Sequence, residues 1–160
     1  MESIQMKAIG IIHTQFENRR NMPIQPNGNS AGKGSISIFN EYKEGLEDLD
    51  GFSHIILIYY LHQNTGYKLK LKPFMDHNEH GIFATRAPHR PNSIGLSVVK
   101  IESIEENMIT FDGADMLNNT PLLDIKPYIP AFDSPDNCKT GWYPDQGNQA
   151  EITISDDRFI

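Results

Sequence analysis

Short apolar runs recur along the chain and are separated by polar residues that favour turns. The runs are rich in β-branched side chains, which is typical of strands rather than helices. Between them lie Pro26-Asn27-Gly28-Asn29, Pro91-Asn92-Ser93, Asp112-Gly113 and Asn118-Asn119, whose residue types build tight turns. The pattern predicts strands within Ala8–Thr14, Ser35–Phe39, His54–Leu61, Ile82–Thr85, Leu96–Ile104, Met108–Phe111 and Glu151–Ile154.

Many short strands with few helices predict a mainly β fold, and we expect a single small antiparallel β-barrel. Only Glu41–Leu49 has helical spacing, so one short helix is expected. Residues 131–149 contain prolines and glycines without a periodic apolar pattern and predict a long C-terminal loop. Its Trp142 and Tyr143 are expected to pack over the barrel. At 160 residues the chain fits one domain, residues 1–160.

Several classes of protein are disfavoured by composition and motifs. The longest apolar run, Ile55–Leu61, is far too short to span a bilayer, so no membrane partner is expected. The chain starts without a basic and apolar leader, which predicts a cytoplasmic location. Neither G-x-G-x-x-G nor G-x-x-x-x-G-K-[ST] occurs, so the two commonest phosphate loops are missing. The histidines show no H-x-x-x-H spacing and Cys138 is the only cysteine, so no metal site is expected.

Charge is distributed unevenly along the chain. The net charge of −7 argues against a nucleic-acid partner, but residues 66–100 carry six Lys or Arg against two Asp or Glu, a net +4. Residues 101–160 carry three Lys or Arg against twelve Asp or Glu, a net charge of −9. Lys68, Lys70 and Lys72 alternate at strand spacing in the basic segment. A solvated edge strand protected by lysines explains them better than a binding surface does.

Four polar clusters lie next to the ends of apolar runs, where a barrel has its mouth. In the first, two prolines fix the loop Met22–Pro26, which is either a structural turn or a holder of ligand-binding carbonyls. In the second, His62 and Gln63 end a very apolar strand. They either form hydrogen bonds within the core or bind the polar edges of a ligand.

The third cluster is the densest and spans Gly81–Ser97. Arg86 and Arg90 are four residues apart, and their forked donors suit a carboxylate or a phosphate better than a buried salt bridge. The fourth cluster, Asp112–Pro121, offers Asp112 and Asp115 as acceptors for a ribose or a cationic amino group. Asp124 and Lys126 follow it and alternate onto one face.

Three phrases in these clusters resemble the TrmO or TsaA-like family. They are Gly-Ile-Phe-Ala-Thr-Arg at 81–86, Arg-Pro-Asn-Ser-Ile-Gly at 90–95 and Asp-Ile-Lys-Pro-Tyr at 124–128, and the resemblance covers about residues 6–132. The resemblance implies a β-barrel methyltransferase that uses S-adenosyl-L-methionine and is usually a homodimer. It also implies action on the N6 nitrogen of N6-threonylcarbamoyladenosine in the tRNA anticodon stem-loop. Several members continue into an extra C-terminal domain that this sequence lacks.

The resemblance also implies which residues bind the ligands. Residues Arg90, Asn92, Lys126 and Tyr128 would contact the tRNA or brace the site. The cofactor would lie against Pro23, Ile24, Gln25, His62, Gln63, Arg86, Leu96, Asp112, Gly113, Ala114 and Asp115.

The chemistry of this reaction asks for a proton acceptor. The target nitrogen lies between an adenine ring and a carbonyl and is a poor nucleophile until it loses or shares its proton. His89, Asp112 and Asp115 are eligible acceptors, and the sequence does not choose between them. Two other functions stay open: a methyltransferase of the same barrel for a small molecule or protein, and a non-catalytic S-adenosyl-L-methionine-binding protein.

Overall fold

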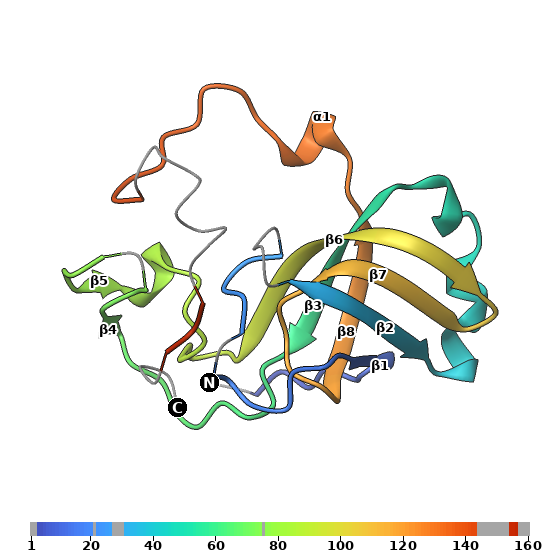
Figure 1. Cartoon of the computed structure of the whole chain (residues 1–160), viewed down its shortest axis with the longest axis horizontal. Coiled ribbons are helices and arrows are strands. Elements are labelled where there is room, and N and C mark those ends of the chain that lie inside the picture. Colours follow the sequence, from blue (N-terminus) through green and yellow to red (C-terminus); the bar gives the residue numbers. More distant parts are fainter. Residues whose placement is uncertain (1–2, 21, 27–30, 75, 144–153, 157–160) are drawn as a thin grey trace.

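A closed antiparallel barrel forms the body of the protein in the computed structural model (Figure 1). The structure describes residues 3–20, 22–26, 31–74, 76–143 and 154–156. The six strands follow the order β1-β2-β7-β6-β3-β8 around the barrel. Their bounds are β1 Gly10–His13, β2 Gly32–Ile38, β3 His54–Tyr60, β6 Ile94–Glu105, β7 Met108–Ala114 and β8 Thr120–Pro127. The predicted fold class is therefore confirmed.

Alternation of buried and exposed positions closes the barrel around one core. On β3, Ile55, Leu57 and Tyr59 face inward, and on β7, Ile109 and Phe111 do the same. Side chains from all six strands meet inside, because successive residues of a strand point to opposite faces. The fully buried members include Ile12, Ile36, Ile55, Leu57, Ile109, Phe111 and Leu122.

Strand β8 was not among the predicted strands. It contains Pro121 and Pro127, residues that lower strand propensity. Both prolines lie at its ends, opposite Ile11 and Ile55 in the neighbouring strands, where few ladder hydrogen bonds are lost. The apolar pattern of this strand was hidden by the prolines.

The predicted helix at Glu41–Leu49 is present in altered form. Two 3-10 helices, η1 Asn40–Leu46 and η2 Leu49–Gly51, replace one continuous helix. Asp48 has a φ of 64°, so its left-handed backbone separates the two turns. The structure also has one short α-helix, α1 Pro130–Asp133, at the start of the predicted C-terminal loop. None of the described helices is long and apolar enough to cross a membrane.

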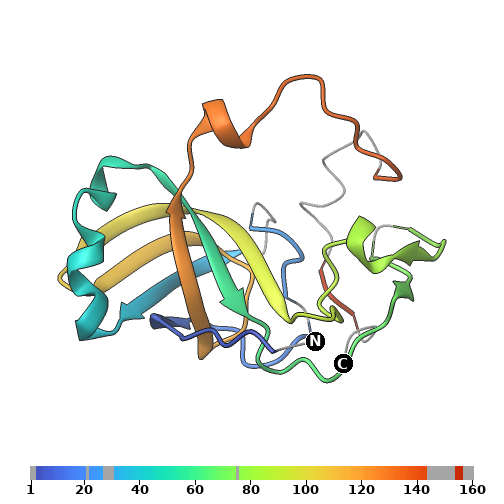
Figure 2. The ribbon, with the colours of Figure 1, turned by 180° about the vertical axis from the view of Figure 1, so that it is seen from behind.

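A small second unit, which we call the arm, stands beside the barrel in both ribbon views (Figures 1 and 2). It comprises the described residues of 66–87, with β4 Lys70–Leu71, β5 His80–Gly81 and the 3-10 turn η3 Ile82–Ala84. Leu71, Ile82 and Ala87 form its own small core, against which Phe74 packs.

Two predictions about this region were wrong. Ile82–Thr85 is a turn rather than a strand, because the Thr85 N–H and hydroxyl both donate to the Ile82 carbonyl. Trp142 packs on the arm rather than the barrel. Its ring stacks on His80 with centroids 4.5 Å apart, and its Nε1 donates to the Ala84 carbonyl at 2.8 Å. The rest of the predicted loop, residues 144–149, lies outside the described residues.

The C-terminal residues 154–156 return to the first polar cluster. Ile154 pairs with Pro23, and Ser155 bonds to the backbone of Arg19 and Met22. Only Ile154 of the predicted strand Glu151–Ile154 lies within the described residues. The contacts hold the loop before Gln25 in place.

Candidate functional site at the barrel mouth

One end of the barrel, the mouth, gathers polar residues from distant parts of the sequence. We define it by the end of β3 with His62–Gln63, the start of β6 at Ile94–Ser97, and Asp115 after β7. Ile94 lies opposite Tyr60, and Ser97 donates to Asp115, so these segments meet. The loop containing Gln25 and the arm flank the mouth, and Arg86 donates from Nη1 to Gln25 Oε1 at 3.4 Å. The mouth therefore combines three of the four predicted clusters directly.

A chain of three hydrogen-bonded side chains leads from the barrel interior to the mouth. The Ser97 hydroxyl donates to Asp115 Oδ1 at 2.7 Å, and Tyr59 and Ser97 hydroxyls are 3.0 Å apart. Because Ser97 has one proton and gives it to Asp115, the Tyr59 hydroxyl is the donor in the second bond. Tyr59 and Ser97 are both buried.

This environment perturbs the titration of Asp115. Burial raises the pKa of its carboxyl from 3.8 to about 7, while the Ser97 bond and the Arg86 charge lower it. Burial also raises the pKa of Tyr59, which stays a protonated donor. A carboxylate that accepts protons near neutral pH suits general base chemistry.

Tyr59 and Ser97 were missed by the sequence analysis, although a signal for them exists. Both are polar residues at buried positions, and the next inward residue of each strand, Leu57 or Val99, is apolar. Tyr59 lies opposite Gly95, and its ring occupies the space that a side chain at position 95 would fill. A Cβ on Gly95 would lie 2.2 Å from Tyr59 Cε2. The Gly95 in the third cluster thus makes room for the tyrosine.

Replacing Gly95 with alanine tests this packing. We expect Gly95→Ala to lower the free energy of unfolding by about 1–3 kcal/mol, because Tyr59 is forced from its position. Gly45→Ala is the matched control, since a Cβ there meets nothing within 4 Å and its backbone is not left-handed. Urea unfolding measures both. Equal stability of the two variants would contradict the packing described.

His62 is a half-buried histidine just beyond the end of β3. Burial and the Arg19 charge lower its pKa. Thr120 donates its hydroxyl proton to the Leu117 carbonyl, and its oxygen lies 3.4 Å from His62 Nδ1. The half-buried ring therefore places a polar group at the end of β3. Gln63 beside it is exposed.

Asn64, next to these two residues, was also missed. Its Nδ2 donates to the Ser93 hydroxyl and the Gly66 carbonyl. A carbonyl only accepts, so the amide orientation is fixed. Its buried Oδ1 has no hydrogen-bond partner among the described residues. A buried acceptor without a partner is unusual and marks this edge of the mouth.

Two predicted cofactor residues face the outside of the barrel wall. Leu96 on β6 is 50% exposed, and Asp112 on β7 is exposed while Gly113 and Ala114 are buried. Alternation explains the difference between Asp112 and Gly113, because Asp112 is out of phase with Phe111 and Gly113 is in phase with it. The Pro26 carbonyl lies 3.1 Å from where a Gly113 Cβ would be, so the first loop covers this part of the wall.

The predicted substrate residues divide into two groups. Arg90 donates from Nη1 to the carbonyls of Ile82, Thr85 and Ala87, so its contacts favour the bracing role over tRNA contact. Asn92 is exposed in the turn that enters β6. These two residues belong to the arm side of the mouth.

Lys126 and Tyr128 are not brought to the mouth. They lie at and just beyond the far end of β8, and Lys126 is six positions after Thr120, about 20 Å along the strand. Lys126 forms an ion pair with Asp124 at 3.0 Å, and the Tyr128 ring contacts His54. A shared role with the mouth residues therefore needs a substrate or a partner that spans this distance.

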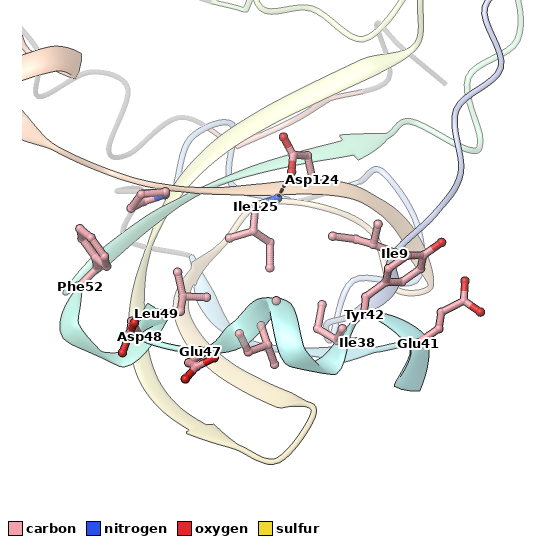
Figure 3. Close-up of a pocket in the computed structure, with 13 residues that line it drawn as sticks. Ile9, Ile38, Glu41, Tyr42, Glu47, Asp48, Leu49, Phe52, Asp124 and Ile125 are labelled. Carbon is pink, nitrogen blue, oxygen red and sulfur yellow. Dashed lines mark hydrogen bonds between the residues drawn. The ribbon is translucent and has the colours of Figure 1, made fainter.

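A pocket of about 550 Å³ lies at that opposite end of the barrel (Figure 3). Apolar side chains such as Ile9, Ile38 and Leu49 line it, and the acidic residues Glu41, Glu47, Asp48 and Asp124 are also among its lining residues. Its acidic lining is unfavourable for phosphate or nucleic acid. None of the predicted cofactor residues lines this pocket, so it is separate from the mouth.

The fold and the mouth define a class: a small antiparallel barrel whose polar site is built from loops and strand ends. Comparison with known families matches residues 11–134 to a family described as tRNA-methyltransferase O N-terminal domain. The chain belongs to this family, as the resemblance predicted.

Curated relatives and solved structures agree with this assignment. A "Probable S-adenosyl-L-methionine-binding protein" of Pyrococcus abyssi is 43% identical over 96% of this chain and 84% of its own length. The "tRNA (adenine(37)-N6)-methyltransferase" of Homo sapiens is 38% identical over 81% of this chain and 31% of its own length. The crystal structure of TrmO from Pseudomonas aeruginosa superposes with a TM-score of 0.73 at 33% identity, covering 89% of this chain and 64% of that one. The chain thus spans most of the archaeal relative and a smaller part of the others.

Proposed function

We propose that this protein is an S-adenosyl-L-methionine-dependent methyltransferase that acts on the N6 nitrogen of N6-threonylcarbamoyladenosine in the anticodon stem-loop of tRNA. Membership of the family and the names of the relatives support the reaction class. The observation that carries the proposal is the meeting of Gln25, Arg86 and Asp115 at one mouth.

The residues at the mouth fit the chemical groups of the cofactor. Arg86 is an exposed forked donor for the carboxylate of the methionine part. His62 offers a ring nitrogen at the mouth, while Asp112 and Leu96, exposed on the adjoining outer wall, offer an acceptor and apolar surface to the adenosine part of the cofactor. The donors and acceptors thus match a zwitterionic nucleoside. The bound cofactor would supply an electrophilic methyl group on a sulfonium.

Asp115 is the residue that we assign to the target nitrogen. With its raised pKa it would accept the N6 proton as the nitrogen bonds to the methyl carbon and the bond from that carbon to the sulfonium sulfur breaks, which would leave the cofactor as a neutral thioether. Ser97 holds the carboxylate through a 2.7 Å bond and Tyr59 holds Ser97, so both are positioning residues. Of the three acceptors that the sequence offered, Asp112 faces the outer wall, and only Asp115 is tied into the buried relay.

A threonylcarbamoyl group on the substrate favours this chemistry. Its carbonyl withdraws electrons and acidifies the N6 proton, which lowers the demand on the base. An anticodon loop presents its modified base without the cost of opening a helix. Incubation with methyl-labelled cofactor and matched tRNAs, with and without threonylcarbamoyl, tests the specificity. We expect label only in the modified tRNA, and equal labelling of both would overturn it.

We also propose that two copies of the chain form a homodimer, as the family resemblance implies. Lys126 and Tyr128 lie about 20 Å along β8 from the mouth of their own chain, and a second copy is one way to bring them to a shared substrate. Light scattering should return twice the chain mass at micromolar concentration. A monomer mass across that range would contradict the dimer.

A further inference from the structure

The arm carries exposed apolar side chains that its own core does not use. Phe83 is 77% exposed, Leu69 is 62% exposed and Tyr67 is 60% exposed, while Leu71 and Ile82 fill the small core between the strands. Apolar side chains that gather on one surface mark an interaction site more often than scattered ones do.

Phe83 is presented by a loop whose backbone is held from several sides. Arg90 binds the carbonyls of Ile82, Thr85 and Ala87, and Trp142 binds the carbonyl of Ala84. The carbonyls on both sides of Phe83 are therefore fixed while its ring faces solvent. A rigid exposed aromatic loses little conformational entropy when a planar partner stacks on it.

Exposed lysines lie on the segment that runs beside the Phe83 loop. The Ile82 N–H donates to the Leu69 carbonyl at 2.9 Å, and the Lys68 N–H donates to the His89 carbonyl at 3.2 Å, so residues 68–69 run beside the Phe83 loop. Lys68, Lys70 and Lys72 are all exposed. The surface lies in the +4 segment of a chain whose net charge is −7.

The nature of the partner follows from this composition. Basic side chains interleaved with exposed aromatic and aliphatic ones suit a single-stranded nucleic acid, whose phosphates pair with lysines and whose bases stack on rings. A two-fold contact between copies of this surface would place lysine near lysine, and lysine is depleted at the cores of protein interfaces. The position also suits a substrate, because Phe83 is three residues from Arg86 at the mouth.

We propose that the arm is an RNA-contacting surface, on which Phe83 stacks against an unpaired base of the tRNA loop while Lys68 and Lys70 contact the flanking phosphates. The identity of the RNA rests on the proposed function. The surface itself is assigned from the arm, and it differs from the site residues implied by the family resemblance.

Fluorescence anisotropy with a labelled, unmodified anticodon stem-loop RNA tests the proposal without requiring methylation. Phe83→Ala should weaken RNA binding about 5- to 100-fold, and Phe83→Trp should keep it, because base stacking needs a ring. Phe132→Ala is the matched control: Phe132 is 78% exposed but lies on α1, away from the arm (Figure 1). Calorimetry should find the same cofactor affinity in Phe83→Ala as in the wild type.

The lysines are tested through salt dependence. Lys70→Ala should reduce the slope of log K against log salt by about 1, because one phosphate contact is lost. Lys43→Ala, an exposed lysine on η1 at the other end of the barrel, should leave the slope unchanged.

Several results would overturn the proposal. Equal RNA affinity of Phe83→Ala and Phe132→Ala would remove Phe83 from the surface. Conversion of a dimer to a monomer by Phe83→Ala would make the arm a contact between copies. If the wild type methylates tRNA but these variants bind RNA normally, only the arm proposal fails. If the wild type binds RNA through Phe83 but transfers no methyl group, the proposed reaction fails and the arm assignment stands.

Discussion

Arg86→Ala should weaken S-adenosyl-L-methionine binding about 10- to 100-fold in calorimetry, because a charge-assisted, forked hydrogen bond is lost. Arg86 is exposed at the mouth and reaches Gln25, so its guanidinium is open to a carboxylate of the ligand. Lys72→Ala is the control, since Lys72 is an exposed cation on the arm. The cofactor affinity of Arg86→Lys should lie between those of Arg86→Ala and Lys72→Ala, because lysine keeps the charge but lacks the forked pair of donors.

Equal cofactor affinities of Arg86→Ala and Lys72→Ala would remove Arg86 from the cofactor site. A second effect follows from the position of Arg86 near Asp115. The Arg86 charge lowers the pKa of Asp115, so Arg86→Ala should also move the pH profile of any remaining activity to higher pH.

Asp115→Asn should reduce the rate of methyl transfer about 10²- to 10⁴-fold, the usual contribution of a positioned base. Asparagine keeps an acceptor for Ser97 but cannot take up the proton, so cofactor affinity should change little. In the wild type, kcat/KM should rise with pH and level off near the Asp115 pKa of about 7. Ser97→Ala removes a bond that lowers this pKa and should move the profile to higher pH.

The same carboxyl gives a stability test that is independent of activity. Its pKa is raised from 3.8 to about 7 on folding, so between these values the unfolded chain binds fewer protons than the folded one. The contribution of Asp115 to the free energy of unfolding therefore falls as pH rises through this range. Asp115→Asn removes the ionisation. The thermal midpoint of the variant minus that of the wild type should therefore increase as the pH is raised from below 3.8 to above 7. A constant difference across this range would contradict a raised pKa.

The barrel was predictable because alternation along strands is a local property of the sequence. Runs such as His54–Leu61 and Met108–Phe111 became β3 and β7 with small shifts of their ends. Strand β8 was not predicted because Pro121 and Pro127 lower the strand propensity of its sequence. The strand forms through its pairing with β1 and β3, which the local sequence does not show. The apolar run Ile82–Thr85 predicts a strand but forms a turn at Ile82–Ala84, because short apolar runs do not distinguish the two.

The site was predictable in composition but not in geometry. Arg86 and Arg90 look alike in sequence, yet one is exposed at the mouth and the other is bound to three carbonyls. Asp112 and Asp115 differ in the same way, since one faces the outer wall and the other accepts from Ser97. Such differences depend on loops that pack through long-range contacts, which a single sequence does not fix.

The most direct test of the account is mass spectrometry of tRNA nucleosides from a strain in which the gene is deleted and from its complemented partner. We predict that the deletion strain accumulates N6-threonylcarbamoyladenosine without the N6 methyl group, and that complementation restores the methylated nucleoside. The Asp115→Asn gene should fail to restore it. An unchanged nucleoside profile in the deletion strain, with the methylated form still present, would contradict the assignment of this protein to that reaction.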